Sequence, residues 1–548
     1  MRLFVIYIVL LFTASAGTIA QTAWQADGVP VCTAGGDQMN PVIVPDMKGG
    51  GIVIWQDDRS GNLDLYAQRI DSAGNRLWAN NGVALASSAE MENEPKAISD
   101  MRGGAIMVFN KGSYNIWMQR VDSAGNPCWG VNGKAMCDND SLQMSYRLCS
   151  DSAGGAIIIW SNADTFATGL ADWDAYAQRV DSTGSLLWGA SGIVVANGSN
   201  DQQASGIVED GQGGGIIFWR YDYPGLDYRF YAERLDANGN SLWPLPSPIC
   251  TTSGEKYFWD VTTDGRGGGI AVWKDKRSGN WDIYAQRVDS SGNARWQLNG
   301  VPVCTVAYSQ EEPVIVSDGN GGGIIIWQDY RTGPITRTDI YAQRIDGGGN
   351  PLWTQNGLGL CIYDSTQGYP GAASDGHGGA IVTWFDGRTG YTDIRNIFGQ
   401  WVDSSGSCRW GSDGLAVCTA AGLQWNDIYN RQNQMIPDGQ GGAIAVWHDY
   451  RNGGQADIYA HRMRGHTGVM GEPTPASEIK PALRAWPNPF RSYAFVSGNK
   501  PGGTLRVYDV TGRLVEKSDG SIIGKRLPAG IYFITAEENE TIKAIKLK

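Results

Sequence analysis

The stretch PVIVSDGNGGGIIIWQDYRTGPITRTDIYAQRIDGGGNPLWTQNGLGLC, residues 313–361, decides the fold. It predicts four short strands, at residues 313–318, 323–327, 339–346 and 349–361. The second of these is continuously apolar, which suits a strand buried on both faces, and the last is expected to bend at Asn356 and Gly357. A glycine triplet provides the tight turn between the first two strands, because glycine tolerates positive φ. Four strands in one such unit match the size of a propeller blade.

The same pattern recurs eight times along the chain. One tryptophan series marks the last strand of each unit, at Trp24, Trp78, Trp129, Trp188, Trp243, Trp296, Trp353 and Trp410. A second aromatic series ends the second strand, at Trp55, Phe109, Trp160, Trp219, Trp273, Trp327, Trp384 and Trp447. The last unit breaks off after residues 458–463, whereas residues 22–33 carry its missing piece. We therefore expect an all-β fold, an eight-bladed β-propeller over residues 21–465 that the N-terminal strand closes, leaving no open edge.

Composition agrees with an all-β, turn-rich chain. Glycine accounts for 75 of the 548 residues and tryptophan for 22. This much glycine disfavours a helical protein, and this much aromatic mass disfavours disorder. The formal net charge of -12 disfavours nucleic acid and anionic membrane surfaces as partners.

The N-terminus has the pattern of a secretory signal. Arg2 precedes an apolar run at residues 3–12 that is too short to span a bilayer, and small residues lead to a cleavage site before Gln21. We expect residues 1–20 to be this signal, and no transmembrane segment after its removal. The alternative interpretation is a short membrane anchor.

Export permits disulfides, and the chain has nine cysteines, an odd number. Six of them share one repeated position that alanine fills in the other two units, which indicates a small buried pocket. The pairs Cys128–Cys137 and Cys408–Cys418 each flank the bend of one outer strand and could form disulfides.

The spacing from the last turn to the tryptophan is constant. Trp353 follows Asp346 by seven residues, and the other units repeat this spacing. The unit resembles the tryptophan-docking motif of pyrroloquinoline quinone dehydrogenases, which also have eight blades, although the turn here is one residue shorter. The resemblance implies that these tryptophans dock blade on blade. It supports the architecture more than the activity, since an adjacent cysteine pair and a calcium-site cluster are missing.

One face of the ring is expected to be uniform and the other variable. The turns between the first and second and between the third and fourth strands hardly change, whereas the other two connections differ strongly, and function usually resides on such loops. A charged motif, WxDxR, recurs at the variable face. The candidate ligand-binding residues are Asp57, Arg59, Asp275, Arg277, Asp329, Arg331, Asp386, Arg388, Asp449 and Arg451, with Tyr257, Trp259 and Trp425 as aromatics that could stack on sugar rings. The alternative roles are turn stabilisation and blade packing.

Signs of catalysis are few. The four histidines do not have metal-ligand spacing, and a nucleophile-elbow motif is missing. The DGxGGG turns lack the further oxygen ligands that calcium needs. We therefore predict no catalytic residue, no metal and no cofactor.

The composition changes after residue 465. Residues 466–482 form a Gly/Pro/Thr-containing linker, and residues 483–548 predict a small Ig-like β-sandwich. The segments AWPNPF (485–490), VYDVTGRLV (507–515), LPAGIYFITA (527–536) and the terminal IKAIKLK resemble the C-terminal sorting domain of type IX secretion cargo. Trp486 replaces the more usual Tyr, and the Ig-like domain of flagellar hook-capping proteins shares the pattern. The resemblance implies passage through the outer-membrane secretion machinery, followed by release or surface attachment.

These observations favour a secreted or cell-surface propeller that binds a glycan or a surface protein on its variable face. One alternative is an extracellular enzyme, either a polysaccharide-active hydrolase or lyase or a quinoprotein. A hydrolase would need two carboxylates about 5–10 Å apart over the channel. The other alternative is a purely structural surface protein.

Overall fold

The computed structural model describes residues 24–112, 115–137, 141–164, 172–332, 337–388, 396–425, 434–465, 484–486, 494–497, 504–518, 522–523, 527–535 and 541–546. The predicted signal at residues 1–20 and the predicted linker at 466–482 lie outside these residues. The chain divides into two compact units, Met1–Thr467 and Gly468–Lys548. In the described part of the chain, no helix has the length and apolar character needed to cross a membrane.

The described residues of the first unit form seven four-stranded antiparallel sheets that follow one another along the chain. The first sheet consists of β2 (Gln38–Pro45), β3 (Gly51–Asp57), β4 (Asp64–Ile70) and β5 (Val83–Ala86), and the second of β6 (Glu92–Ser99), β7 (Ala105–Lys111), β8 (Asn115–Val121) and β9 (Lys134–Ala135). The third consists of β10 (Leu142–Ser150), β11 (Ala156–Asp164), β12 (Asp172–Val180) and β13 (Ile193–Ala196), and the fourth of β14 (Gln202–Glu209), β15 (Gly215–Tyr223), β16 (Asp227–Leu235) and β17 (Ser247–Cys250).

The next three are β18 (Lys256–Thr263), β19 (Gly269–Asp275), β20 (Asp282–Val288) and β21 (Val301–Cys304); β22 (Gln310–Ser317), β23 (Gly323–Asp329), β24 (Asp339–Ile345) and β25 (Leu358–Cys361); and β26 (Gln367–Ser374), β27 (Ala380–Asp386), β28 (Asn396–Val402) and β29 (Leu415–Cys418). The last strand of the quoted repeat is shorter than predicted, because only β25 pairs continuously and Pro351 forms an isolated bridge with Ile345. Asn356 and Gly357, both with positive φ, make the predicted bend.

The remaining sheet of this unit joins the two ends of the repeat. It contains β30 (Gln424–Trp425), β31 (Met435–Pro437), β32 (Ala443–Asp449) and β33 (Asp457–Met463), and its outer strand is β1 (Val29–Cys32). β1 pairs antiparallel with β33, with Val29 opposite Ala460 and Pro30 opposite Tyr459. This pairing confirms that the N-terminal strand completes the last sheet.

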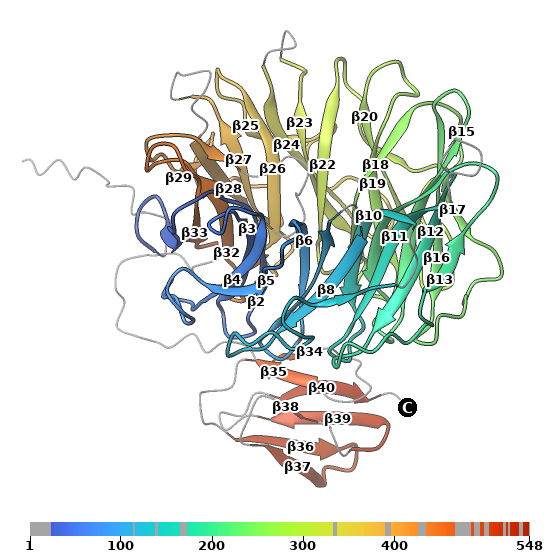
Figure 1. The fold of residues 1–548 in the computed structure, drawn as a ribbon. Coiled ribbons are helices and arrows are strands. Elements are labelled where there is room, and N and C mark those ends of the chain that lie inside the picture. Colours follow the sequence, from blue (N-terminus) through green and yellow to red (C-terminus); the bar gives the residue numbers. More distant parts are fainter. Residues whose placement is uncertain are drawn as a thin grey trace, which may run out of the picture. The chain divides into compact units, whose positions relative to one another are not determined.

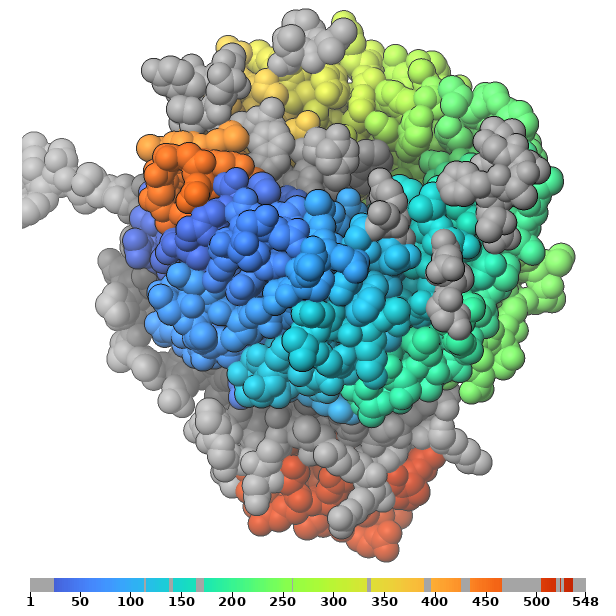
Figure 2. Space-filling view, in the orientation of Figure 1, coloured from blue at the N-terminus to red at the C-terminus, as the bar shows by residue number. Residues whose placement is uncertain are grey.

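The sheets are arranged as in a propeller (Figure 1). The innermost strand of each sheet contacts that of the next, from β2 through β6, β10, β14, β18, β22 and β26 to β31, and β31 contacts β2 again. Figure 2 shows the blue N-terminal residues directly against the orange residues of the last sheet. Each sheet therefore contacts the next one, and the last sheet contacts the first.

Tryptophans that precede the outer strands dock the sheets on their neighbours at seven of the eight junctions. Trp296 donates its Nε1–H to the carbonyl oxygen of Gly347 over 3.1 Å. Its ring packs on Gly349, which has a φ of +90°, where a Cβ atom would come within 2.9 Å of the indole. Equivalent bonds join Trp24 to Ser72, Trp78 to Ser123, Trp129 to Ser182, Trp188 to Ala237, Trp243 to Ser290 and Trp353 to Ser404. The predicted docking is thus confirmed for seven of the eight tryptophans, and the Trp24 bond spans the junction of the last sheet with the first. Trp410 is buried, but in the described part of the chain its Nε1–H has no hydrogen-bond partner.

The cysteines do not cross-link the unit. Neither Cys128 with Cys137 nor Cys408 with Cys418 forms a disulfide, and all nine cysteines have free thiols. The disulfide hypothesis is therefore wrong for both pairs: the Sγ of Cys137 instead accepts a hydrogen bond from Gln143. Burial raises the pKa of Cys304 to about 12, which keeps this thiol protonated and disfavours its oxidation.

Two buried histidines distinguish the last sheet. His448 and His461 are almost fully buried, and in the described part of the chain neither ring nitrogen of His461 has a hydrogen-bond partner. Burial lowers the pKa of His448 to about 3 and that of His461 to about 4. Both rings are therefore neutral in the folded protein at neutral pH.

Acid is expected to destabilise the last sheet. An unfolded histidine takes up a proton near pH 6.5 whereas the folded ones do not, so stability is complete above that pH and falls as the pH drops toward 4. At pH 5 each histidine should lower the free energy of unfolding by about 2 kcal/mol. His461→Gln should remove the part of this acid destabilisation that His461 causes, and glutamine should fit because it occupies this position in most other sheets. His377→Gln, on an exposed turn, is the control. Urea unfolding at pH 5 and 7 measures this, and an unchanged pH dependence in His461→Gln would contradict it.

The described residues of the second unit form two antiparallel sheets. One is formed by β34 (Arg484–Trp486), β35 (Ala494–Ser497) and β38 (Ile522–Ile523), and the other by β36 (Leu505–Asp509), β37 (Leu514–Ser518), β39 (Gly530–Thr535) and β40 (Thr541–Lys546). Leu505, Val507 and Ile534 are fully buried and supply its core.

Candidate functional site

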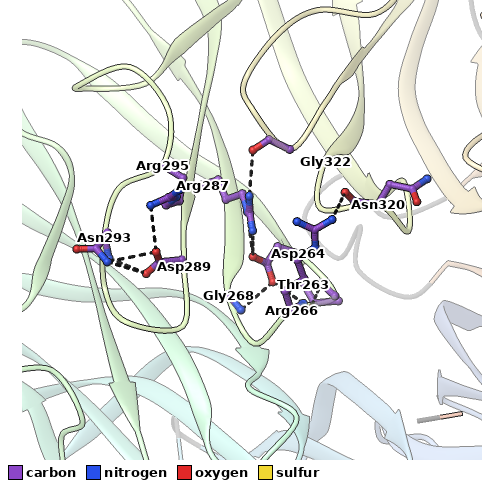
Figure 3. A network of polar contacts seen from close by, with 12 residues as sticks. Thr263, Asp264, Arg266, Gly268, Arg287, Asp289, Asn293, Arg295, Asn320 and Gly322 are labelled. Carbon is purple, nitrogen blue, oxygen red and sulfur yellow. Dashed lines mark hydrogen bonds and ion pairs between the residues drawn. The ribbon is translucent and has the colours of Figure 1, made fainter. Parts of the chain in front are cut away.

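The uniform turns are occupied by structural contacts. Asp264 Oδ1 accepts hydrogen bonds from the amides of Arg266 and Gly268, each over 2.7 Å, while its Oδ2 binds the guanidinium of Arg287 (Figure 3). Arg287 also donates to the carbonyl of Gly347 in the next sheet, the same oxygen that accepts the Trp296 bond. The matching ion pairs are Arg69–Asp46, Arg120–Asp100, Arg179–Asp151, Arg234–Asp210, Arg344–Asp318 and Arg462–Asp438. This end of the ring is a scaffold.

The WxDxR motif lies at the opposite end of the sheets, where the variable loops meet. Trp327 donates its Nε1–H to Asp329 Oδ2 over 2.7 Å. Arg331 donates to the same carboxylate through its backbone amide, over 2.8 Å, and through Nη2, over 2.6 Å. Burial alone would lower the pKa of Arg331, but its hydrogen bond to Asp329 and the carboxylate charge raise it, so the guanidinium stays charged.

The arginine of the motif also links two sheets. Arg331 Nη2 donates to the Sγ of Cys304 over 3.2 Å, and Cys304 belongs to the preceding sheet. The same nitrogen donates to the carbonyl of Asn356 over 2.8 Å, and the guanidinium lies 3.7 Å from the ring centre of Tyr341. The predicted small pocket around the cysteine is therefore occupied by an arginine.

All five predicted Asp–Arg pairs have this geometry. The carboxylates of Asp57, Asp275, Asp329, Asp386 and Asp449 are at most 1% exposed, whereas the side chains of Arg59, Arg277, Arg331, Arg388 and Arg451 are 14–23% exposed. A ligand at the variable face would therefore meet the edges of the arginines and not the aspartates.

The predicted aromatic residues are spread over two sheets. Tyr257 lies in β18, half-buried, with its ring centre 5.5 Å from that of Tyr228 and 5.5 Å from that of Trp281. Trp259 also lies in β18 and Trp425 in β30, and their side chains fall outside the described part. Sequence reasoning missed Tyr228 and Trp281. The available signal for Trp281 was that it belongs to neither tryptophan series.

Three consecutive sheets, those beginning at β6, β10 and β14, lack the motif. In the last of them Tyr221 and Tyr223 replace the aspartate and the arginine, and Ala196 replaces the cysteine. The two tyrosine rings lie 4.5 Å apart. In this sheet the aspartate, the arginine and the cysteine are thus exchanged together while Trp219 remains, so its part of the variable face differs from that of the five sheets with the motif. In the described part of the chain no cluster of side chains could hold a metal ion.

Comparison with known proteins identifies the second unit. Residues 484–547 match the model of the secretion system C-terminal sorting domain. The protein is exported by the type IX secretion system. Its place of action is therefore the cell surface or the extracellular space, and its C-terminal domain interacts with the secretion machinery.

Several solved structures resemble the chain at low identity. A puromycin hydrolase mutant complexed with PGG is 12% identical, with a TM-score of 0.42 over 78% of this chain and 62% of that one. A post-proline cleaving enzyme from Rickettsia typhi is 11% identical (TM-score 0.43; 76% and 58% covered), and a thermostable family-43 glycoside hydrolase is 10% identical (TM-score 0.28; 50% and 96% covered). The chain thus spans less than two thirds of the puromycin hydrolase. No curated protein matches it.

Proposed function

We propose that residues 21–465 form a closed eight-bladed propeller that binds a glycan or another surface protein through the variable-loop face, and that residues 483–548 form an Ig-like sorting domain. The division of roles between the two ends of the sheets supports this best. One end repeats the same buried Asp–Arg pair and tryptophan bond in every sheet except β26–β29, where Trp401 replaces the arginine. The other end presents arginine edges and aromatic rings beside loops that differ.

Binding should depend on the arginine edges of the variable face. The full-length protein is tested against immobilised polysaccharides and against outer-membrane proteins. Arg331→Ala and Arg388→Ala should each weaken binding about tenfold, which corresponds to about 1.4 kcal/mol. The matched controls are Arg295→Ala and Arg409→Ala on the scaffold turns, whose side chains are 53% and 45% exposed.

Each variant is checked by thermal unfolding, because Arg331→Ala and Arg388→Ala also remove the partner of a buried carboxylate. If all four arginine variants are folded and retain binding while a variant of Tyr257 loses it, the proposal is restricted to the aromatic part of the face. Binding that follows the scaffold-turn variants instead would overturn it.

A further inference from the structure

Three aromatic rings form a row at the boundary of the sheets β14–β17 and β18–β21. Tyr228 lies in β16, Tyr257 in β18, and Trp281 immediately before β20. Successive ring centres are 5.5 Å apart, with an angle of 47° between the planes in both pairs. Each side chain is half-buried, so it is held in place and still meets solvent. Segments far apart in the sequence thus build one aromatic surface, which we call the aromatic row.

Cations lie over these rings. The guanidinium carbon of Arg220 is 4.5 Å from the ring centre of Tyr228. Lys274 Nζ is 4.9 Å and Lys276 Nζ 5.3 Å from the ring centre of Trp281. Such contacts hold the rings in fixed orientations, because the cation is attracted to the face of the π system.

Each of these cations also has a carboxylate partner. Arg220 pairs with Asp222, Lys274 with Glu311 over 2.9 Å, and Lys276 with Glu255 over 3.1 Å. The charges around the aromatic row therefore cancel in pairs. An anionic ligand gains no net attraction here, and the net charge of -12 repels it at longer range.

The aromatic row lies where a sheet without the motif meets one that has it. Its first sheet is the one in which Tyr221 and Tyr223 replace the WxDxR aspartate and arginine. The β15–β16 hairpin ends in Leu226, which is 54% exposed and has a φ of +62°. A bulky residue is unfavourable in that conformation, and an exposed leucine contributes nothing to the core. The hairpin thus presents apolar surface that folding does not require.

Resting on the proposed function, we propose that the aromatic row binds a neutral oligosaccharide. Tyrosine and tryptophan offer rigid apolar faces beside polar groups, which matches the alternation of C–H faces and hydroxyls on a sugar ring. The Tyr257 hydroxyl, the paired carboxylates and the lysine ammonium groups supply hydrogen-bond donors and acceptors at the ring edges. A cationic ligand is disfavoured because Arg220, Lys274 and Lys276 already place positive charge beside the rings.

The test is a titration of the full-length protein. The probes are neutral hexasaccharides of glucose, mannose and xylose and, as an anionic comparison, a hexamer of galacturonic acid, followed by calorimetry and tryptophan fluorescence. At least one neutral hexasaccharide should bind. Trp281→Ala and Tyr257→Ala should each weaken the affinity for this hexasaccharide at least tenfold, whereas Trp281→Phe, which keeps an aromatic ring, should retain most of the affinity.

The control is Tyr308→Asn, which removes a 57% exposed tyrosine of a neighbouring loop; asparagine tolerates the positive φ there. Its affinity should change less than twofold. Saccharide binding that is indifferent to Trp281→Ala and Tyr257→Ala, or binding of the galacturonic acid hexamer only, would overturn the inference while the binding function stands. Failure of every saccharide to bind would also overturn the inference. The proposed function would still hold in that case if the variable face binds a surface protein.

Discussion

Deletion of residues 24–33 is expected to abolish folding of the first unit. The deletion removes β1, and with it the antiparallel pairing to β33 and the bond from Trp24 to Ser72 of the first sheet. It also removes the buried side chains of Trp24, Val31 and Cys32. Burial of one large apolar side chain is worth about 1.5–3 kcal/mol, so the total loss of about 5–10 kcal/mol is comparable to the stability of a typical domain. The purified protein should aggregate or lack a cooperative thermal transition.

The chain offers a matched control for this deletion. Residues 24–32 read WQADGVPVC, and residues 296–304, the corresponding stretch of another sheet, read WQLNGVPVC. Replacing the first by the second changes only Ala26→Leu and Asp27→Asn, and should retain a transition within a few degrees of the parent. A deletion variant as stable as the parent would contradict closure by the N-terminal strand.

Asp264→Ala is expected to destabilise the protein by about 3–5 kcal/mol. Asp264 is 1% exposed, and its loss leaves the buried guanidinium of Arg287 without its carboxylate and two turn amides without acceptors. Breaking a buried ion pair from one side is costly because the remaining charge stays out of water. Urea unfolding followed by tryptophan fluorescence measures the free energy of unfolding.

Asp289→Ala is the matched control, because Asp289 also accepts two backbone N–H bonds in a turn but is partly exposed. Its loss should cost only about 1 kcal/mol. Similar losses in the two variants would show that the buried pair contributes no more to stability than an ordinary turn aspartate, and the expected difference between them would be wrong.

Periodicity made much of the fold predictable. The tryptophan docking and the place of the N-terminal strand were both predicted, because each depends on a position that recurs along the chain. The missing last strand after residues 458–463 and the orphan piece at residues 22–33 were visible in the same comparison of repeats. The fourth strand was predicted too long, because the bend at Asn356 and Gly357 separates it from the preceding tryptophan.

The contacts of the candidate site were less accessible to sequence reasoning. Arg331 binds Cys304 of the preceding sheet, a partner 27 residues away that a repeat pattern shows only as a small residue. The aromatic row draws on Tyr228, Tyr257 and Trp281 from three loops or strands that do not share a period. Side chains that depart from a repeat have no second copy to reveal their neighbours, so their geometry requires the structure.

Hydrogen exchange of the full-length protein tests closure of the ring most directly. The amides of Val29, Val31 and Cys32 in β1 should exchange as slowly as those of Val301, Val303 and Cys304 in β21, which has the same sequence, VPVC, in an internal sheet. Mass spectrometry of the two corresponding peptides compares them within one sample. Equal protection is the predicted result. Rapid exchange of residues 29–32 beside a protected β21 would contradict closure, because the N-terminal strand would then not be paired to β33.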